Sequence, residues 1–376
     1  MTKKDNSLKK IGIFSVGTAG HVIPGVRIIN ELKKQGFDLK NILVVTGNRD
    51  EKKYYRKLGI EVIEYNFVRT KNSSIYYLIN FIGVLKSIYF LHRTIGIYNI
   101  SVIFTTGSYI APLISFLGYV KNIPTYLQEQ NIYAGLGNYL GSFFGDKVYT
   151  SFPNTEHLNK KKVQFVGPVL DSSIEKNRTK LMNNLDSRFK KGKICIGVQG
   201  GSQGSQEINE FVYQIFHNWN EFPIELFHIT GGLEVKDLDN KIVQYKKFDF
   251  IEDMETYYDS INIQITRGGG GLLESAFIGI INIIVPYKYG TTSIHQKSNS
   301  QYLVDNKAAL MIENQDVKYF KEIVLSFLSE EALRGEDSVT LPDITEVYMN
   351  GARDSVKYGA REVIASELYG EYKKSI

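Results

Sequence analysis

The segment Ile11-Gly12-Ile13-Phe14-Ser15-Val16-Gly17-Thr18-Ala19-Gly20-His21 decides the fold class. A short apolar run ends in a glycine turn, which is the pattern of a buried strand that leads into a helix. Comparable apolar runs recur at residues 42–46, 102–106, 125–127, 148–152, 194–198, 226–230, 261–266 and 281–286, with amphipathic segments between them. This alternation predicts β-α-β units around parallel sheets.

The length of the chain indicates two domains. It has 376 residues, and a domain takes about 150. Glycine-rich turns occur in both halves, at residues 17–21, 200–204 and 268–271. The regular pattern lapses between residues 167 and 193 into a polar, basic stretch, so we expect a linker and the domain boundary there. Two α/β domains that face each other would form a cleft.

Composition and charge exclude several classes of protein. Hydrophobic residues make up 43% and charged residues 23%, as in a globular protein, and the net charge of +5 is too small to suggest a nucleic-acid binder. The charge is unevenly distributed: residues 1–168 carry 22 basic and 10 acidic side chains, and the remainder carries 23 and 30. The lone cysteine, Cys195, lies in an apolar run and fits a reducing cytoplasm.

One long apolar stretch, at residues 75–91, raises the question of a membrane span. Asn80 and Lys86 interrupt it, and His92 and Arg93 close it, so it is a poor candidate for a transmembrane helix. The N-terminal residues lack the apolar core of a secretory signal. The stretch is either a helix of the first core or a helix that dips into a membrane interface.

The three glycine turns each follow a predicted strand and precede a predicted helix. Backbone N–H groups at such a helix start bind anions, and phosphate is the usual guest. The spacing fits neither the Walker motif nor the dinucleotide fingerprint, which weakens ATPase and dehydrogenase assignments. A single glycine loop could equally be a tight turn, but three at strand ends favour a phosphate-containing ligand.

Polar side chains follow two strands of the first half. His21 lies at a helix entry, where a neutral imidazole could accept a proton or could merely cap the helix. Glu129-Gln130-Asn131 ends another strand, where these groups could contact a sugar or cap the next helix.

The second half carries further candidates near its last glycine turn. Arg267 precedes the four glycines, Glu274 follows them, and Gln296 and Asn299 lie on the next predicted helix. Carboxylate and amide groups of this kind bind sugar hydroxyls, although each could also be a cap or a solvated polar residue. Asp237 and Asp239 lie in a polar loop, so we interpret them as a solvated turn and expect no metal site.

In their order along the chain, the motifs at residues 17–21, 129–131, 200–204, 250–254, 267–274 and 295–299 resemble the MurG family of peptidoglycan N-acetylglucosaminyltransferases, in glycosyltransferase family 28. The resemblance implies a GT-B fold of two Rossmann-like, doubly wound parallel-sheet domains facing each other across a cleft. Residues 1–168 would form the acceptor- and membrane-facing domain, and residues 169–345 the UDP-sugar-binding domain. A C-terminal helix at about residues 346–376 would pack back onto the first domain.

The resemblance also implies the reaction. It is an inverting transfer of N-acetylglucosamine from UDP-N-acetylglucosamine to the C4 hydroxyl of the muramyl sugar of an undecaprenyl-linked acceptor, without a cofactor or metal ion, and with His21 as general base. The basic first domain would meet the anionic inner membrane surface, so that the protein is peripheral on the cytoplasmic face. No nucleic acid is expected as a partner.

The resemblance assigns substrate contacts at the strand ends. Ser202 would hold the α-phosphate, the Ile251 main chain the uracil, and Glu274 the ribose. In the first domain the expected contacts are Thr18, Ala19, Gly20, Glu129 and Asn131; in the second they are Gly201, Ser202, Gln203, Ile251, Arg267, Gly270, Gly271, Leu272, Leu273, Glu274, Gln296 and Asn299. The expected membrane-facing residues are Arg69, Lys71, Ile75, Leu78, Ile82 and Arg93.

Some positions depart from the family pattern. Ala19 stands where a glycine is expected, so its φ should be negative or strained. Leu170 replaces a family arginine that contacts the donor, and the loop at residues 267–274 is one residue short. A transferase with another lipid-linked acceptor, a UDP-sugar 2-epimerase and a non-catalytic UDP-sugar-binding regulator therefore remain alternatives.

Overall fold

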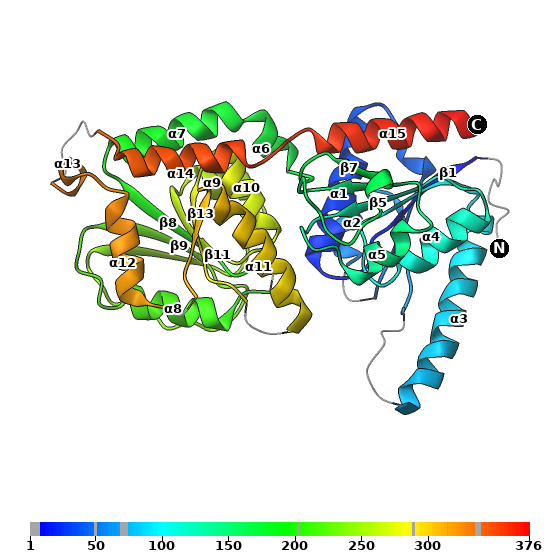
Figure 1. Cartoon of the computed structure of the whole chain (residues 1–376), viewed down its shortest axis with the longest axis horizontal. Coiled ribbons are helices and arrows are strands. Elements are labelled where there is room, and N and C mark those ends of the chain that lie inside the picture. The colour runs from blue at the N-terminus through cyan, green and yellow to red at the C-terminus, as the bar shows by residue number, and fades with distance from the viewer. Residues whose placement is uncertain are drawn as a thin grey trace. The chain divides into compact units, whose positions relative to one another are not determined.

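The computed structural model describes residues 8–48, 51–67, 74–201, 203–287, 290–313, 315–334 and 340–376, with only the backbone of residues 74–80, 290–292, 332 and 333. The chain forms two compact units (Figure 1). The first comprises Met1–Leu170 together with Tyr358–Ile376, and the second comprises Asp171–Lys357. The chain therefore leaves the first unit once and returns to it once.

A seven-stranded parallel sheet forms the centre of the first unit, in the order β3-β2-β1-β4-β5-β6-β7. The strand order reverses between β1 and β4, and loops at the carboxyl ends of strands beside such a reversal commonly bind ligands. The strands are β1 (Lys10–Phe14), β2 (Ile42–Thr46), β3 (Glu61–Glu64), β4 (Ile100–Thr105), β5 (Thr125–Glu129), β6 (Lys147–Thr150) and β7 (Val163–Phe165).

The central strands of this sheet are buried on both faces. All five residues of β2 and of β5 are buried. Alternate residues point to opposite faces, so Ile13 and Val44 pack in one core cluster while Phe14 and Val45 pack in another. A parallel sheet covered on both sides requires continuous apolar runs, which explains the sequence pattern.

Helices cover this sheet. Helix α15 packs against α1 through Ile364 and Leu368, and Figure 1 shows α3 extending away from the sheet. The helices of the first unit are α1 (Ala19–Lys34), α2 (Lys53–Arg56), α3 (Ser74–Ile97), α4 (Ala111–Val120), α5 (Leu136–Ser142) and α15 (Ala360–Ser375), with the 3-10 turns η1 (Leu39–Asn41) and η2 (Lys160–Lys162).

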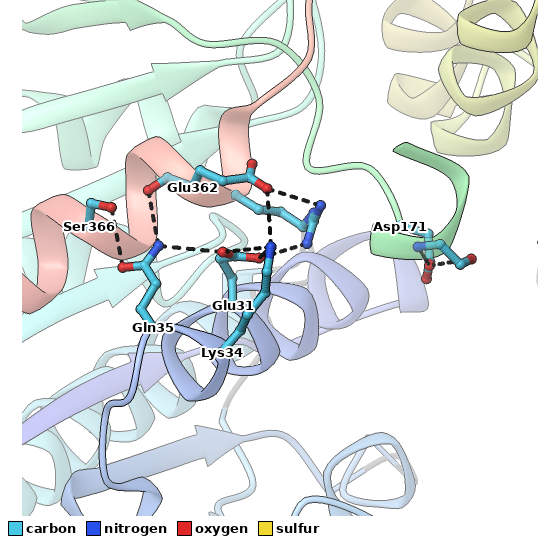
Figure 2. A network of polar contacts seen from close by, with 8 residues as sticks. Glu31, Lys34, Gln35, Asp171, Glu362 and Ser366 are labelled. Atoms are coloured by element: carbon cyan, nitrogen blue, oxygen red, sulfur yellow. Dashed lines mark hydrogen bonds and ion pairs between the residues drawn. The ribbon is translucent and has the colours of Figure 1, made fainter. Parts of the chain in front are cut away.

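A buried ion pair joins α15 to α1. Arg361 Nη1 donates to Glu31 Oε2 at 2.9 Å, and the two side chains are 4% and 2% exposed. Lys34 and Gln35 also approach Glu31, at 3.5 Å, as Figure 2 shows. The returning C-terminal segment is thereby attached to the helix that begins beside the end of β1.

The second unit has a six-stranded parallel sheet in the order β10-β9-β8-β11-β12-β13, which reverses between β8 and β11. Asp171 accepts a hydrogen bond from the backbone N–H of Ser173 and so caps α6 (Ser172–Lys176), as Figure 2 shows. The strands are β8 (Ile194–Gln199), β9 (Ile224–Ile229), β10 (Val243–Phe248), β11 (Ile263–Thr266), β12 (Ile281–Ile284) and β13 (Ala309–Met311). The helices are α6 (Ser172–Lys176), α7 (Arg178–Lys190), α8 (Gln206–Phe216), α9 (Met254–Asp259), α10 (Gly270–Ile278), α11 (Gly290–Asp305), α12 (Val317–Ser326), α13 (Glu330–Leu333) and α14 (Asp343–Asp354).

Two expectations about chain organisation are wrong. The stretch expected to be a linker contains α6 and α7, because Leu181, Leu185 and Phe189 recur every four residues and are buried within an otherwise polar sequence. The single helix expected at residues 346–376 is two helices. Of these, α14 belongs to the second unit, and α15 alone packs onto the first.

Candidate active site

His21 lies in the first turn of α1, just beyond the carboxyl end of β1. Its Nδ1 is 2.9 Å from the carbonyl oxygen of Thr106, which follows β4. Because a carbonyl oxygen only accepts hydrogen bonds, Nδ1 carries the proton, and Nε2 of the neutral ring is the proton acceptor. The hydroxyl of Ser15 donates to the His21 carbonyl at 2.8 Å. Ring and backbone are thus held in the arrangement that a general base requires.

The turn before His21 depends on glycine. Gly17 has a φ of 129°, and a Cβ at this position would lie 3.1 Å from Cδ2 of His21. Its N–H donates to Oε1 of Glu51 at 3.3 Å. Ala19 opens α1, so its φ is negative and unstrained, as expected. Glu51 follows β2 and was not predicted, since nothing in its local sequence indicates a contact with Gly17.

Thr18 and Gly20 complete the first turn. The carbonyl of Thr18 accepts hydrogen bonds from the N–H groups of His21 and Val22, while its side chain makes no capping bond. The Gly20 carbonyl accepts a hydrogen bond from the side-chain amide of Gln130. The structure therefore brings the loop after β1 next to the loop after β5, and both loops contain residues that the sequence predicts as site residues.

Glu129 organises its own loop. Its Oε1 accepts from the N–H groups of Gln130 and Asn131 and from the Asn131 side chain, at 2.8–2.9 Å. Its Oε2 accepts from Gly135 N–H at 3.0 Å and from Asn138 Nδ2 at 2.8 Å. These contacts match the alternative of a polar turn before a helix, so we leave the Glu129 carboxylate out of the proposed substrate contacts.

The loop after β4 also contributes to this region, although it is not among the sites predicted from the sequence. Its Thr106 orients His21, Gly107 has a φ of 97°, and Ser108 has a φ of 69°. Asn138 of α5 packs against Gly107, where a Cβ would lie 2.8 Å from Asn138 Nδ2. The signal was available, because a glycine follows an apolar strand here as it does at the other loops.

The loop after β8 is the first anion-binding candidate of the second unit. Gly204 packs so closely on the Thr230 carbonyl that a Cβ would collide with it, whereas a Cβ on Gly201 would meet no described atom within 4 Å. Ser205 caps α8 by accepting from the Ile208 N–H at 3.3 Å. Gln203 is exposed, and Ser202 lies outside the residues that the structure describes.

Beneath this loop, a buried network supports Thr230. Asn209 Nδ2 approaches the Thr230 carbonyl at 3.4 Å, and Asn209 Oδ1 lies 2.9 Å from Nε2 of His228. The other ring nitrogen of His228 is 2.9 Å from the Tyr245 hydroxyl. Burial lowers the pKa of His228 to about 4, so the ring is neutral at physiological pH.

The start of α10 is the second candidate. Cβ atoms on Gly269 and Gly270 would meet no described atom within 4 Å, so the backbone is open to a ligand. Leu272 and Leu273 are buried, so these residues could offer a ligand only main-chain groups. The first N–H groups of a helix have no intrahelical partner and attract anions.

Arg267 supports the loops of this edge. Its Nη1 donates to the carbonyls of Val285 and Pro286 at 3.0 and 2.9 Å. Its Nη2 donates to Ser205 Oγ at 2.6 Å and pairs with Glu207 at 2.7 Å. The guanidinium thus links the end of β12 to the start of α8. These bonds occupy the side chain that was expected to contact substrate, so we assign Arg267 a positioning role.

Three other predicted residues lie around α10 and α11. Tyr258 donates to Glu274 Oε2 at 3.4 Å, and the Glu274 side chain is largely buried. Asn299 Nδ2 donates to the Gly268 carbonyl at 3.1 Å and so positions the glycine turn. Gln296 Oε1 is buried with no hydrogen-bond partner in the described part of the chain, as is Gln199 Oε1 at the end of β8. Ligand hydroxyls could satisfy these two oxygens.

The remaining predictions concern Ile251, the membrane face and metals. Ile251 lies in the loop after β10. Of the expected membrane-facing residues, Arg69 and Lys71 lie outside the described residues, and so do the side chains of Ile75 and Leu78. Ile82 is 47% exposed. Arg93 Nη1 lies 3.4 Å from the Tyr89 hydroxyl. Among the described residues, no helix is long and apolar enough to span a membrane. The same residues contain no cluster of three or more metal-ligating side chains.

Comparisons with known proteins give matches over both units. A model of the glycosyltransferase family 28 N-terminal domain matches residues 11–150, and one of the family 28 C-terminal domain matches residues 195–337. The UDP-N-acetylglucosamine–N-acetylmuramyl-(pentapeptide) pyrophosphoryl-undecaprenol N-acetylglucosamine transferase of Halothermothrix orenii is 28% identical over 82% of this chain and 87% of its own length. The protein of that name from Listeria monocytogenes serotype 4b is 28% identical over 96% and 97%.

Solved structures share the fold. The crystal structure of Acinetobacter baumannii MurG has a TM-score of 0.75 at 21% identity, covering 96% of this chain and 99% of that one. UDP-GlcNAc 2-epimerase from Neisseria meningitidis, bound to UDP-GlcNAc, has a TM-score of 0.60 at 13% identity, covering 96% and 100%. The predicted architecture, two parallel-sheet α/β domains of the GT-B type, is confirmed.

Proposed function

The chain belongs to glycosyltransferase family 28, and from this premise we propose that it transfers N-acetylglucosamine from UDP-N-acetylglucosamine to the muramyl sugar of an undecaprenyl-pyrophosphoryl acceptor. Relatives with this activity in their names match most of the chain. The single observation that carries the mechanism is the hydrogen bond from His21 Nδ1 to the Thr106 carbonyl, because it makes Nε2 the proton acceptor.

The second unit would bind the donor. A Cβ on Gly201 or Gly270 would meet no described atom within 4 Å, so the backbone at these two strand ends leaves room for a diphosphate, which backbone N–H groups at a helix start would bind. Glu274 would accept hydrogen bonds from the ribose hydroxyls, and Gln296 would offer its buried amide oxygen to a hydroxyl of N-acetylglucosamine. The Ile251 main chain would face the uracil. UDP would leave with its developing negative charge stabilised by these N–H groups.

The first unit would supply the base. The C4 hydroxyl of the muramyl sugar would give its proton to His21 Nε2 as its oxygen bonds to the anomeric carbon of N-acetylglucosamine. The bond from that carbon to the UDP oxygen breaks on the opposite side, so the configuration inverts and a β-1,4 link forms. Thr18 and Asn131 lie on the two loops next to His21 and would contact the acceptor or the donor sugar. General-base help of this kind contributes about 10²–10⁴-fold.

We propose that the exposed side of α3, α4 and α5 binds the anionic cytoplasmic surface of the membrane, where the lipid-linked acceptor resides. Phe81, Leu85 and Tyr89 recur every four residues on α3 and are 60%, 49% and 63% exposed. The rings of Phe116 on α4 and Phe144 beyond α5 are 5.3 Å apart, so apolar side chains of α4 adjoin those beyond α5, and α3 packs next to α4. The other exposed apolar residues of this side are Ile82, Tyr119, Val120, Leu136, Tyr139, Leu140 and Phe143. The excess of basic residues in the first unit favours an anionic surface.

The proposed reaction can be tested with radiolabelled UDP-N-acetylglucosamine and purified protein. The panel of acceptors contains undecaprenyl-pyrophosphoryl-muramyl-pentapeptide and other lipid-pyrophosphate sugars. We expect label in the muramyl lipid. Label in a different lipid sugar would show that the proposed acceptor is wrong and that the protein is nevertheless a transferase. Conversion of the free nucleotide sugar to its 2-epimer without an acceptor would instead identify an epimerase.

A further inference from the structure

Ser108 has an unusual backbone conformation for a serine. Its φ of 69° lies in the left-handed region, a backbone conformation that residues other than glycine, asparagine and aspartate rarely adopt. The residue lies between β4 and α4. Of the other described non-glycine residues with positive φ, two are asparagines, Asn99 and Asn122, whose side chains tolerate this conformation.

Packing holds this backbone in place whatever the side chain. The Ser108 carbonyl lies against Gly137 so closely that a Cβ there would collide with it, and it accepts a hydrogen bond from the Ala111 N–H at 3.2 Å. The preceding Gly107 packs on the side-chain amide of Asn138, which donates to the Gln128 carbonyl at 2.9 Å. A position so constrained would be most stable with glycine, and serine therefore calls for another explanation.

The hydroxyl of Ser108 is available to a ligand. It makes no hydrogen bond to any residue that the structure describes, and the residue is partly exposed. A Cβ placed on Gly17 would lie 3.7 Å from Ser108 Oγ and 3.1 Å from Cδ2 of His21. The Ser108 and His21 side chains therefore lie near each other, on either side of the space above Gly17. Two residues earlier in the same loop, the Thr106 carbonyl holds the His21 ring.

We propose that Ser108 is an acceptor-contacting residue whose hydroxyl donates a hydrogen bond to an oxygen of the acceptor sugar, next to the hydroxyl that His21 deprotonates. This inference rests on the proposed transferase function. Strained backbone that the surrounding structure maintains is characteristic of functional sites. Two residues of the loop after β4 would then act on the reaction: Thr106 orients His21, and Ser108 positions the acceptor hydroxyl from which His21 takes a proton.

Two variants distinguish the effect of the Ser108 hydroxyl from the effect of the strained backbone. Ser108→Gly removes both, whereas Ser108→Ala removes the hydroxyl and keeps the strain. We expect both variants to raise the KM for the acceptor about three- to tenfold, the effect of one lost hydrogen bond. The KM for UDP-N-acetylglucosamine should stay within about twofold in both. Ser108→Gly alone should raise the Tm, by about 2–4 °C.

Lys307→Gly is the matched control. Lys307 also has a positive φ, of 53°, but it is exposed and follows α11 in the second unit. Its replacement should raise the Tm to a similar extent and leave both KM values unchanged.

The outcomes are distinguishable. An active wild-type protein, combined with an unchanged acceptor KM in both Ser108 variants, would overturn this inference and leave the proposed function intact. A wild-type protein that transfers nothing to any acceptor would overturn the proposed function and this inference with it.

Discussion

Replacing Arg361 with methionine should destabilise the first unit strongly. The change removes the guanidinium that pairs with Glu31 at 2.9 Å, and both side chains are almost fully buried. Breaking a buried pair on one side leaves an uncompensated charge, which costs about 3–5 kcal/mol. Lys34 and Gln35 remain near Glu31 at 3.5 Å and compensate part of its charge, although Lys34 is 66% exposed. We therefore expect the lower end of this range, about 3 kcal/mol.

Equilibrium unfolding in urea measures this loss. With an m-value of about 2 kcal/mol per molar, the midpoint of the first unit should fall by about 1.5 M while m stays constant. The double variant Glu31→Leu with Arg361→Met removes both charges and should recover most of the loss. Lys52→Met is the control in the same unit: its pair with Glu64 is exposed, with 3.3 Å between the charged atoms, and should contribute less than about 1 kcal/mol.

Two results would refute this reasoning. One is an Arg361→Met midpoint that moves no further than that of Lys52→Met. The other is a double variant as unstable as the single variant, since the loss would then arise from packing of the Arg361 side chain and not from the uncompensated charge of Glu31.

Three further predictions concern the donor site, the pH dependence and the membrane. Glu274→Ala should weaken the binding of UDP-N-acetylglucosamine about tenfold or more, measured by calorimetric titration, and unchanged affinity would place the ribose elsewhere. The folded-state pKa of His228, about 4, lies below the ordinary value of 6.5, so its neutral ring stabilises the second unit fully above about pH 6.5. The free energy of unfolding of the second unit should therefore fall by up to about 3 kcal/mol as the pH falls to 4. In His228→Gln the urea midpoint should depend less on pH than in the wild type. The same pH dependence in both proteins would contradict a lowered pKa of His228. Phe81→Ser with Leu85→Ser should reduce sedimentation with anionic vesicles, and undiminished pelleting would exclude this side of α3 from the interface.

The parallel sheets were predictable because their burial imposes local patterns. Continuous apolar runs such as residues 42–46 and 281–286 predict buried strands, and the glycine turns after strands predict the helix starts that follow them. His21 could be selected for the same reason, since its position after a strand and a glycine turn is a local property.

Roles that depend on distant partners could not be predicted. Arg267 looks like a ligand-binding cation in the sequence, but carbonyls and a carboxylate from two other segments surround it in the structure. Glu129 looks like a sugar-binding carboxylate, and its oxygens are taken up by its own loop and by Asn138. In α7 the polar and basic residues outnumber the buried Leu181, Leu185 and Phe189, which obscures the helical spacing.

Replacing His21 with alanine tests its role as general base most directly, because the change should affect sugar transfer and leave UDP binding intact. We predict that transfer of label from UDP-N-acetylglucosamine to the muramyl lipid falls by two or more orders of magnitude, while the affinity for UDP stays unchanged. His217→Ala, which alters an exposed histidine of the second unit, should transfer at the wild-type rate. Transfer by His21→Ala at the rate of that control would show that His21 does not accept the proton of the attacking hydroxyl.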